Sequence, residues 1–552
     1  MMTLNFKKYV YSPFGSWFVA KPKGSDRVTI DDLHGWVGSS NAIFTVESDD
    51  TSTIEFSPYS LTYRKIGEHK MVFSNNNEIV LKGNGNNSFH YVFKADMDRF
   101  NGNPYDAVFA TTISNNILIN DYKNAKYLYL YPIRGEITLD THIVDGEVVP
   151  DRVDVHVSPD KNGVYEVAIL STLPGDYKIP KVDFDFESLE LANKKSFDTM
   201  YDLYSDIENS IEAVYTMWSN FESKSGYFTQ DTQICSKAGM CAIWSWDNCF
   251  SALAMARRMP KVAFYEFMLP YIYLRDDGYM LDSITDQKIS WEYTKPPVHG
   301  YIYRLMMREN EYFSRPEQLK QVLEPMVKNT NWWLTARGVP TYMHGNDSGA
   351  DNATCFDKYM VVTSPDLYAY LAVQCDVISE IMAMLGDDRE VEYRELGVQL
   401  ASKIDEFLID GKLHVQSRVT GEYVATDSLV TYKSIVATNM LSDEVKKVVV
   451  DIIPRYETRY GLASEPLDSD KYVTNGYWRG AIWAPDQALV ITALDAMGYT
   501  DYARKLASTY VNAVKKSGCS ENVDAVSGEG IRCPMYNWTA GVYVYLSDYL
   551  NK

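Results

Sequence analysis

The chain of 552 residues changes its pattern of apolar residues near residue 190. Before that point, short runs of β-branched and aromatic residues, such as residues 127–131, alternate with turns rich in Gly, Asn and Asp. This is typical of antiparallel β-strands. After it, apolar residues recur at i, i+3 and i+4, as in residues 367–384, which indicates helices. The change predicts an N-terminal antiparallel β-sandwich over residues 1–188 and a helical domain over residues 189–552.

The helical part divides into about a dozen segments with their loops, a number that suits paired helices closing into a ring. The segments with clear helical spacing include residues 207–218, 250–257, 319–334, 391–408, 481–497 and 502–514. Hydrophobic residues make up 46% of the chain, which is ample for large cores. We therefore expect a multidomain α and β protein.

The net charge excludes one class of partner. The chain has 53 basic and 74 acidic residues, a formal charge of −21, so a nucleic acid backbone would be repelled. Residues 1–8 lack the apolar core of a secretory signal, and we find no apolar run near the roughly 20 residues that a bilayer span needs. We expect a cytoplasmic protein with neither nucleic acid nor membrane as a partner. Its oligomeric state, monomer or dimer, stays open.

The chain carries no pattern that suggests a metal or a cofactor. Its seven cysteines include no C-x-x-C pair, which argues against a zinc ribbon. Asp347 and Asp351 resemble the start of a calcium loop, but the regular spacing of ligands and the closing Glu are missing. We expect neither a metal site nor a cofactor.

Two carboxylates on separate turn-rich loops suggest hydrolytic chemistry. Asp351 lies in the polar loop of residues 345–352, and Glu521 lies far along the chain in a loop punctuated by Gly528. Glycosidic bond cleavage requires two such carboxylates: one protonates the leaving oxygen and the other acts on water or on the anomeric carbon. Glu529, on the same late loop, is the alternative to Glu521.

Several loops between the helices share Trp, Asp, Asn, Tyr and Gly in close order. An aromatic ring packs against the C–H face of a sugar, and charged or amide groups bind its hydroxyls. The loops together would line a carbohydrate pocket. The candidate substrate-binding residues are Trp246, Asp247, Trp291, Glu292, Lys295, His299, Arg479, Trp483 and Trp538.

The order of the motifs resembles the catalytic domain of glycoside hydrolase family 63 and the related trehalases of family 37. The motifs are W-x-W-D-x-x-F at 244–250, T-K-P-P at 294–297, S-G-x-D-N at 348–352, Y-W-R-G-x-I-W-A-P at 477–485, and E-N-x₅-G at 521–528 followed by W-T at 538–539. The resemblance implies an (α/α)6 barrel and an inverting mechanism. It maps the general acid onto Asp351 and the general base onto Glu521. Some members carry an N-terminal sandwich of the kind expected here.

The resemblance favours α-glucosides as substrates, with mannosylglycerate-type or glucosylglycerate-type compounds as the alternative. Ala350 stands where an aromatic residue is common, and the glycine-rich stretch after the base is shorter than in trehalases. The substrate therefore stays open. Lys295 or Arg479 could bind an acidic aglycone.

Other functional classes share this architecture. A sugar epimerase or isomerase would use paired histidines, and only His299 lies inside a motif. A phosphorolytic enzyme would replace the base by phosphate, which the presence of Glu521 disfavours. A binding protein without catalysis would be expected to lose a carboxylate, and both remain.

Overall fold

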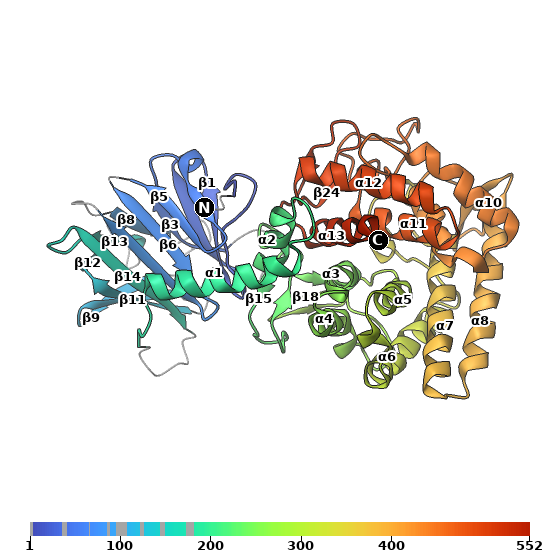
Figure 1. Cartoon of the computed structure of the whole chain (residues 1–552), viewed down its shortest axis with the longest axis horizontal. Coiled ribbons are helices and arrows are strands. Elements are labelled where there is room, and N and C mark those ends of the chain that lie inside the picture. Colours follow the sequence, from blue (N-terminus) through green and yellow to red (C-terminus); the bar gives the residue numbers. More distant parts are fainter. Residues whose placement is uncertain are drawn as a thin grey trace. The chain divides into compact units, whose positions relative to one another are not determined.

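A computed structural model shows the architecture (Figure 1). It describes residues 4–35, 41–65, 67–84, 89–94, 108–121, 126–143, 150–172 and 181–552. The chain forms two compact units. Unit 1 comprises Met1–Ser205 and Val214–Cys241, and unit 2 comprises Asp206–Ala213 and Ala242–Lys552.

The expected boundary between residues 188 and 189 falls inside helix α1 (Phe186–Leu203). Phe186 and Leu189 of this helix pack against Val80 and Ala168 of unit 1. The helix belongs with the β domain because its apolar face covers a sheet, a contact that helical periodicity alone does not reveal.

Within the described residues, the strands of unit 1 form two antiparallel sheets. The first has the order β1 (Phe18–Lys23), β2 (Arg27–Asp32), β3 (Asn41–Glu47), β8 (Phe89–Lys94), β13 (Pro150–Ser158), β12 (Glu136–Ile143). The second has the order β4 (Glu55–Ser57), β5 (Ser60–Arg64), β6 (Glu68–Phe73), β7 (Glu78–Asn84), β14 (Val164–Thr172), β11 (Lys126–Arg134), β10 (Asn116–Asp121), β9 (Val108–Ile113). The expected N-terminal antiparallel β domain is confirmed.

The central strands β7 and β14 are buried on both faces. Val80 and Ala168 meet α1 on one face, while Leu81 and Val167, one position along each strand, are fully buried on the other. Successive side chains in a strand point to opposite faces, so both strands need continuous apolar runs.

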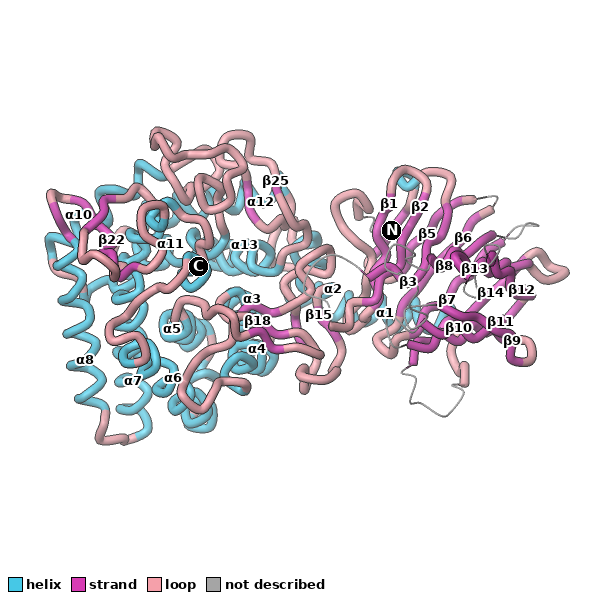
Figure 2. Tube along the Cα trace, turned by 180° about the vertical axis from the view of Figure 1, so that it is seen from behind, coloured by secondary structure: helices cyan, strands magenta, loops and turns pink. Residues whose placement is uncertain are grey.

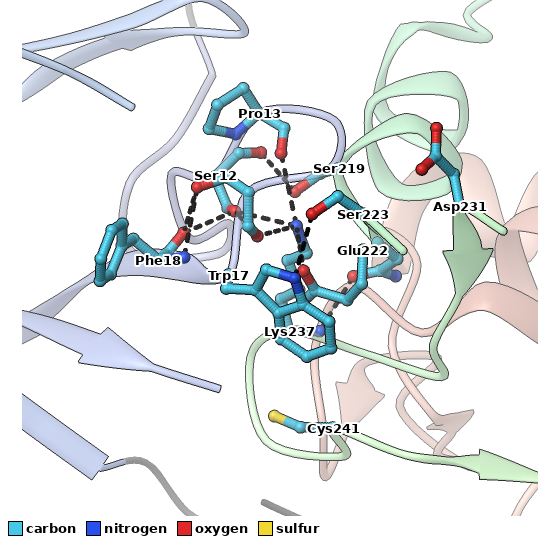
Figure 3. A network of polar contacts seen from close by, with 12 residues as sticks. Ser12, Pro13, Trp17, Phe18, Ser219, Glu222, Ser223, Asp231, Lys237 and Cys241 are labelled. Atoms are coloured by element: carbon cyan, nitrogen blue, oxygen red, sulfur yellow. Dashed lines mark hydrogen bonds and ion pairs between the residues drawn. The ribbon is translucent and has the colours of Figure 1, made fainter. Parts of the chain in front are cut away.

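A buried ion pair fastens the N-terminal segment of unit 1 (Figure 3). The side chains of Lys237 and Glu222 have no exposed surface, and Lys237 Nζ lies 3.6 Å from Glu222 Oε2. The ammonium donates to Ser12 Oγ at 3.1 Å, to the Pro13 carbonyl at 3.3 Å and to the Ser16 carbonyl at 2.6 Å. Burial lowers the pKa of Lys237 to about 8, although the negative charge of Glu222 acts to raise it. These contacts satisfy a cation that would otherwise be costly to bury.

The helices of unit 2 form two layers. The inner helices are α3 (Asp247–Ala256), α5 (His299–Glu309), α7 (Pro365–Leu385), the 3-10 helix η8 (Lys433–Met440), α11 (Ala484–Ala496) and α13 (Asn537–Asn551). Each packs against the next in this order, and α13 packs against α3, which closes the ring. The outer layer consists of α4 (Pro260–Ile272), α6 (Pro316–Thr335), α8 (Glu390–Ser402), α10 (Asp443–Ile452) and α12 (Thr500–Ser517). The (α/α)6 barrel is confirmed.

The remaining α-helices and strands are short. They are α2 (Ile211–Ser219), α9 (Leu429–Tyr432), β15 (Phe221–Glu222), β16 (Thr232–Gln233), β17 (Ile243–Trp244), β18 (Ser283–Ile284), β19 (Ile289–Ser290), β20 (Val362–Thr363), β21 (Leu408–Ile409), β22 (Lys412–Ser417), β23 (Tyr423–Ala425), β24 (Asn522–Val523) and β25 (Gly530–Ile531). Figure 2 shows the loops of unit 2, drawn in pink, over the face turned toward the viewer.

Inner and outer helices bury different shares of their surface. All residues of α3 are buried, whereas α12 buries only one stripe and exposes the rest. A helix with partners all round can be apolar all round. Among the described helices, α7 is long and apolar enough to cross a membrane by length and composition, but 72% of its most apolar window is buried. This is expected of a core helix.

Candidate active site

Asp351 follows a tight turn that needs glycine. The 3-10 helix η5 (Gly345–Ser348) ends at Gly349, which has a left-handed φ of 72°. A Cβ on Gly349 would lie 2.6 Å from the ring of Trp246, and one on Gly345 would lie 2.0 Å from the carbonyl oxygen of Asp351. The turn therefore excludes larger residues at both positions, and it packs Gly349, two residues before the half-buried Asp351, against Trp246.

Glu521 is held by both its backbone and its carboxylate. It precedes β24, and its N–H donates to the Cys533 carbonyl at 2.7 Å. The Cys533 N–H donates to Glu521 Oε2 at 3.3 Å. Glu521 is only 6% exposed, and burial raises the pKa of its carboxyl to about 6. The Cys533 hydrogen bond and Arg532 lower this pKa, while the negative charge of Asp351 raises it.

Asp247 is a third carboxylate of the same site. It is the first residue of α3, it is buried, and its Oδ1 accepts a hydrogen bond from the Tyr536 hydroxyl at 3.0 Å. Burial raises its pKa to about 7, Lys295 and Tyr536 lower it, and the charge of Glu521 raises it. Since Glu521 is also coupled to Asp351, the barrel brings three acidic groups from separate loops into one electrostatic group.

Lys295 is the buried cation of this group. Its ammonium lies 3.3 Å from Asp282 Oδ1 and also bonds the side-chain oxygen of Asn346. Burial raises the pKa of Asp282, Lys295 lowers it, and Asp351 raises it. Lys295 thus ties the T-K-P-P loop to the loop that carries Asp351.

Arg479 fastens the Asp351 loop to its neighbour. Its Nε donates to the Asn352 carbonyl at 3.1 Å, and its guanidinium pairs with Asp357. Its charge is therefore already compensated by a carboxylate.

Four tryptophans pack together beneath these loops. Trp478 and Trp483 stack with ring centroids 3.8 Å apart and an interplanar angle of 6°. Trp538 meets Trp483 edge-on at 5.5 Å and Trp246 at 5.9 Å. Trp483 is 0% exposed, and Trp246 and Trp538 are also buried. The structure thus places these three rings as a support for the site, because large apolar rings gain most from complete burial.

A buried cation lies against the tryptophans. Lys433 Nζ lies 5.6 Å from the ring centroids of Trp246 and of Trp478, and 3.4 Å from Asp486 Oδ1. Burial raises the pKa of Asp486 and Lys433 lowers it. Lys433 stabilises the packing through its charge and the ring faces.

Three further candidate binding residues have surroundings of their own. His299 is 1% exposed, packs against Phe267 and Tyr271, and burial lowers its pKa to about 4, so it is a neutral core residue. Glu292 is exposed and lies 3.9 Å from Lys288, and its charge raises the pKa of Asp282. The half-buried Trp291 packs against Tyr279 and accepts a hydrogen bond from its hydroxyl at 3.2 Å through the backbone carbonyl.

The alternative base Glu529 is exposed, and its carbonyl pairs with the Asp524 N–H at 2.8 Å. Glu529 is not among the charged residues that shift the pKa values of Asp247, Asp282 and Glu521. Of the two candidates, Glu521 is the one that the fold brings to Asp351.

Sequence reasoning assigned no role to several residues of the site. Asn352 and Tyr477 stood inside the quoted motifs, and Asp282 stood in a loop of suitable composition. Arg532 and Lys433 had no signal, because only the closed barrel brings them to the motifs. Among the described residues, no group of three His, Cys, Asp or Glu side chains is placed to hold a metal.

Comparisons with known proteins agree with this geometry. A family model described as the mannosylglycerate hydrolase MGH1-like glycoside hydrolase domain matches residues 241–539, more than half of the chain. The fold is similar to a family 63 mannosylglycerate hydrolase from Thermus thermophilus in complex with Tris, with 16% sequence identity and a TM-score of 0.55 over 61% of this chain and 99% of that chain.

Two further solved structures are similar. The neutral trehalase of Saccharomyces cerevisiae matches with 14% identity and a TM-score of 0.50 over 62% of this chain and 80% of that chain. A bacterial glucoamylase complexed with acarbose matches with 11% identity and a TM-score of 0.59 over 99% of this chain and 94% of that chain. At these identities the structural matches establish the fold.

Proposed function

The chain belongs to the mannosylglycerate hydrolase MGH1-like glycoside hydrolases, and from that premise we propose that it hydrolyses a small α-glycoside with an acidic aglycone, with inversion at the anomeric carbon. The observation that carries the proposal is that hydrogen bonds join both carboxylate loops to residues 475–476: Asn352, after Asp351, bonds Gly476, and Arg532 bonds both Asn475 and Asn522, the residue after the buried Glu521. Two coupled carboxylates on loops far apart in sequence are what an inverting glycosidase needs. The match to the mannosylglycerate hydrolase MGH1-like family supports the mannosylglycerate-type alternative over a simple α-glucoside.

The proposed mechanism uses the two carboxylates in separate roles. Asp351 donates its proton to the glycosidic oxygen as the bond from that oxygen to the anomeric carbon breaks. Glu521, ionised above about pH 6, takes a proton from the water that attacks the opposite face. The sugar leaves with inverted configuration, Asp351 ionised and Glu521 protonated. Room for the water requires carboxylates about 6.5–9.5 Å apart.

Arg532 is the cation that we assign to an acidic aglycone. The sequence pointed to Lys295 or Arg479, but these already pair with Asp282 and Asp357. Arg532 is exposed and forms hydrogen bonds only to neutral oxygens, those of Asn522 and Asn475, within the described part of the chain. A carboxylate on the substrate would supply the bidentate partner that a guanidinium prefers.

Proton NMR tests this function. The purified protein would be incubated with α-mannosylglycerate, α-glucosylglycerate, trehalose and maltose, and the anomeric proton of the released sugar followed from the first turnover. We expect initial release of the β-anomer from a glycerate glycoside, and none from Asp351→Asn or Glu521→Gln. Initial release of the α-anomer would mean retention and would remove Glu521 as the general base. Release only from trehalose or maltose would return the assignment to α-glucosides.

An epimerase is less well supported by the described residues. His299 lies in the core, and the imidazole of His344 accepts a hydrogen bond from the Asn346 N–H at 3.0 Å on a different loop. Paired histidines are not found at the acidic group within the part of the chain that the structure describes. A cytoplasmic location remains a proposal from the sequence.

A further inference from the structure

The loop of residues 475–480 joins the two proposed catalytic loops. It contains Asn475 and Tyr477 with positive φ values of 55° and 65°. Asn tolerates a left-handed backbone, but for a bulky residue such as Tyr477 it is costly and persists only where surrounding contacts enforce it. The conformation at Tyr477 is therefore imposed by its neighbours.

The first set of neighbours lies beside the proposed acid. Asn352, which follows Asp351, donates through Nδ2 to the Gly476 carbonyl at 3.1 Å. Its side-chain oxygen accepts from the Trp478 N–H at 3.0 Å. The two bonds bracket Tyr477, so this residue is fixed relative to the backbone of Asp351.

The second set lies beside the proposed base. Arg532 donates to the side-chain oxygen of Asn522, the residue after Glu521, at 3.1 Å, and to the Asn475 carbonyl at 2.8 Å. Its guanidinium also lies 4.8 Å from the centroid of the Tyr477 ring. The same loop is therefore fastened to the acid loop at one end and to the base loop at the other.

The side chain of Tyr477 lies in the electric field of the acidic group. Its ring meets Trp483 edge-on, with centroids 4.9 Å apart. Burial raises the pKa of the hydroxyl, and the charges of Asp351, Glu521 and Asp247, in that order, raise it further. The hydroxyl is thus a permanent hydrogen-bond donor whose strongest charged neighbour is Asp351.

We propose that Tyr477 is a positioning residue for the proton transfer, with its hydroxyl donating to the carboxylate of Asp351 as that group loses its proton. The proposal rests on the acid role proposed for Asp351. While Asp351 still carries the proton that it donates, the hydroxyl and the carboxyl interact weakly. As the glycosidic oxygen takes the proton, negative charge develops on Asp351 and the hydroxyl donates a charge-assisted hydrogen bond to it. An interaction that strengthens in the transition state lowers the barrier, whereas one of constant strength does not.

The test is Tyr477→Phe, which keeps the ring against Trp483 and under Arg532 and removes only the hydroxyl. It is compared on two substrates with the same sugar: the glycoside that the wild-type protein cleaves fastest, and the glycosyl fluoride. Fluoride leaves with little help from a general acid, so its hydrolysis bypasses the proposed step. Tyr472→Phe is the matched control, since Tyr472 lies in the same region and its hydroxyl is coupled to Asp524 instead.

We expect Tyr477→Phe to lower kcat on the glycoside by about 10- to 100-fold with little change in KM, and to lower kcat on the fluoride by less than about threefold. Tyr472→Phe should match wild type on both. An equal loss on the two substrates, or no loss on the glycoside, would overturn the proposal. Because the glycoside is chosen by wild-type activity, an error in the proposed substrate does not affect this comparison.

Discussion

The indole N–H of Trp538 donates a hydrogen bond of 2.7 Å to the backbone carbonyl of Glu521. This bond ties the loop of the proposed base to the first turn of the inner helix α13, and hence to the barrel wall. The proposed base is positioned by a buried side chain that needs no contact with the substrate.

We predict that Trp538→Phe destabilises the protein by about 1–3 kcal/mol, because the Glu521 carbonyl loses its donor in a buried setting. The turnover number should also fall, since Glu521 loses a support. Chemical denaturation and initial rates measure both effects. Trp291→Phe, at a half-buried position where the ring packs against Tyr279, is the control. Equal effects of the two substitutions would argue against a specific role for the Trp538 bond.

Asp351→Asn and Glu521→Gln should each lower kcat by about 10² to 10⁴, with small changes in KM. Both replacements preserve shape and remove one ionisable group, so the loss reflects proton transfer. Steady-state kinetics on a cleaved glycoside provide the measurement. Glu529→Gln, on the exposed alternative base, should retain full activity. A large loss in Glu529→Gln together with an active Glu521→Gln would exchange the two assignments.

The activity should fall as the pH drops below about 6, because burial raises the pKa of Glu521 from 4.5 to about 6 and the base must be ionised. A profile of kcat/KM between pH 4.5 and 8 would show this limb. Asp247→Asn is the control for the other raised carboxyl, whose pKa is about 7. If the limb disappears in Asp247→Asn, then Asp247, and not Glu521, sets it.

The same shift affects stability. The folded state holds the proton of Glu521 more tightly than the unfolded chain does, so this carboxyl adds stability below pH 4.5 and loses it as the pH rises to about 6. At pH 7, Glu521→Gln should therefore unfold with about 2 kcal/mol more free energy than wild type, and at pH 4 the two should be nearly equal. If the wild type and Glu521→Gln had equal unfolding free energies at pH 7 as well as at pH 4, the burial of the Glu521 charge would be contradicted.

Arg532→Gln should reduce the preference for a glycerate glycoside over the uncharged glycerol glycoside of the same sugar by about tenfold or more, the range expected for a charge-assisted hydrogen bond. The ratio of kcat/KM values for the two substrates is the measurement. Arg394→Gln, on α8, is the control and should leave the ratio unchanged. An unchanged ratio in Arg532→Gln would place recognition of the acid elsewhere.

Lys237→Met should destabilise unit 1 by about 3–5 kcal/mol, because it removes one partner of a fully buried ion pair. Replacing both residues, as Lys237→Met with Glu222→Leu, should recover most of the loss. Lys194→Met removes the exposed pair with Asp198 and should cost less than about 1 kcal/mol. Thermal unfolding of the three variants tests the prediction. If the double variant lost as much stability as Lys237→Met, the broken pairing of Lys237 with Glu222 would not be the cause of the destabilisation.

Local patterns carry only part of the information about the candidate site. The S-G-x-D-N turn needs its glycine because a side chain there would clash with the Trp246 ring. A residue that a turn requires in this way can be recognised as part of a motif from the sequence alone. Trp483 and His299 were predicted to bind sugar, yet one is stacked under Trp478 and the other lies against Tyr271. The sequence of such a loop is the same whether its aromatic or imidazole ring lies beneath the site or within it.

What the sequence determined by itself is the order of the two domains and the class of enzyme. The change of apolar period near residue 190 dictates strands and then helices, because each period fits only one kind of backbone. Only the tertiary structure decided which side chains meet. Tyr477, Arg532 and Asp247 come together with Asp351 and Glu521 when the inner helices close into a ring. The distances between loops that are remote along the chain depend on this closure. The burial that shifts the pKa values of the carboxyl groups also exists only once the ring has closed.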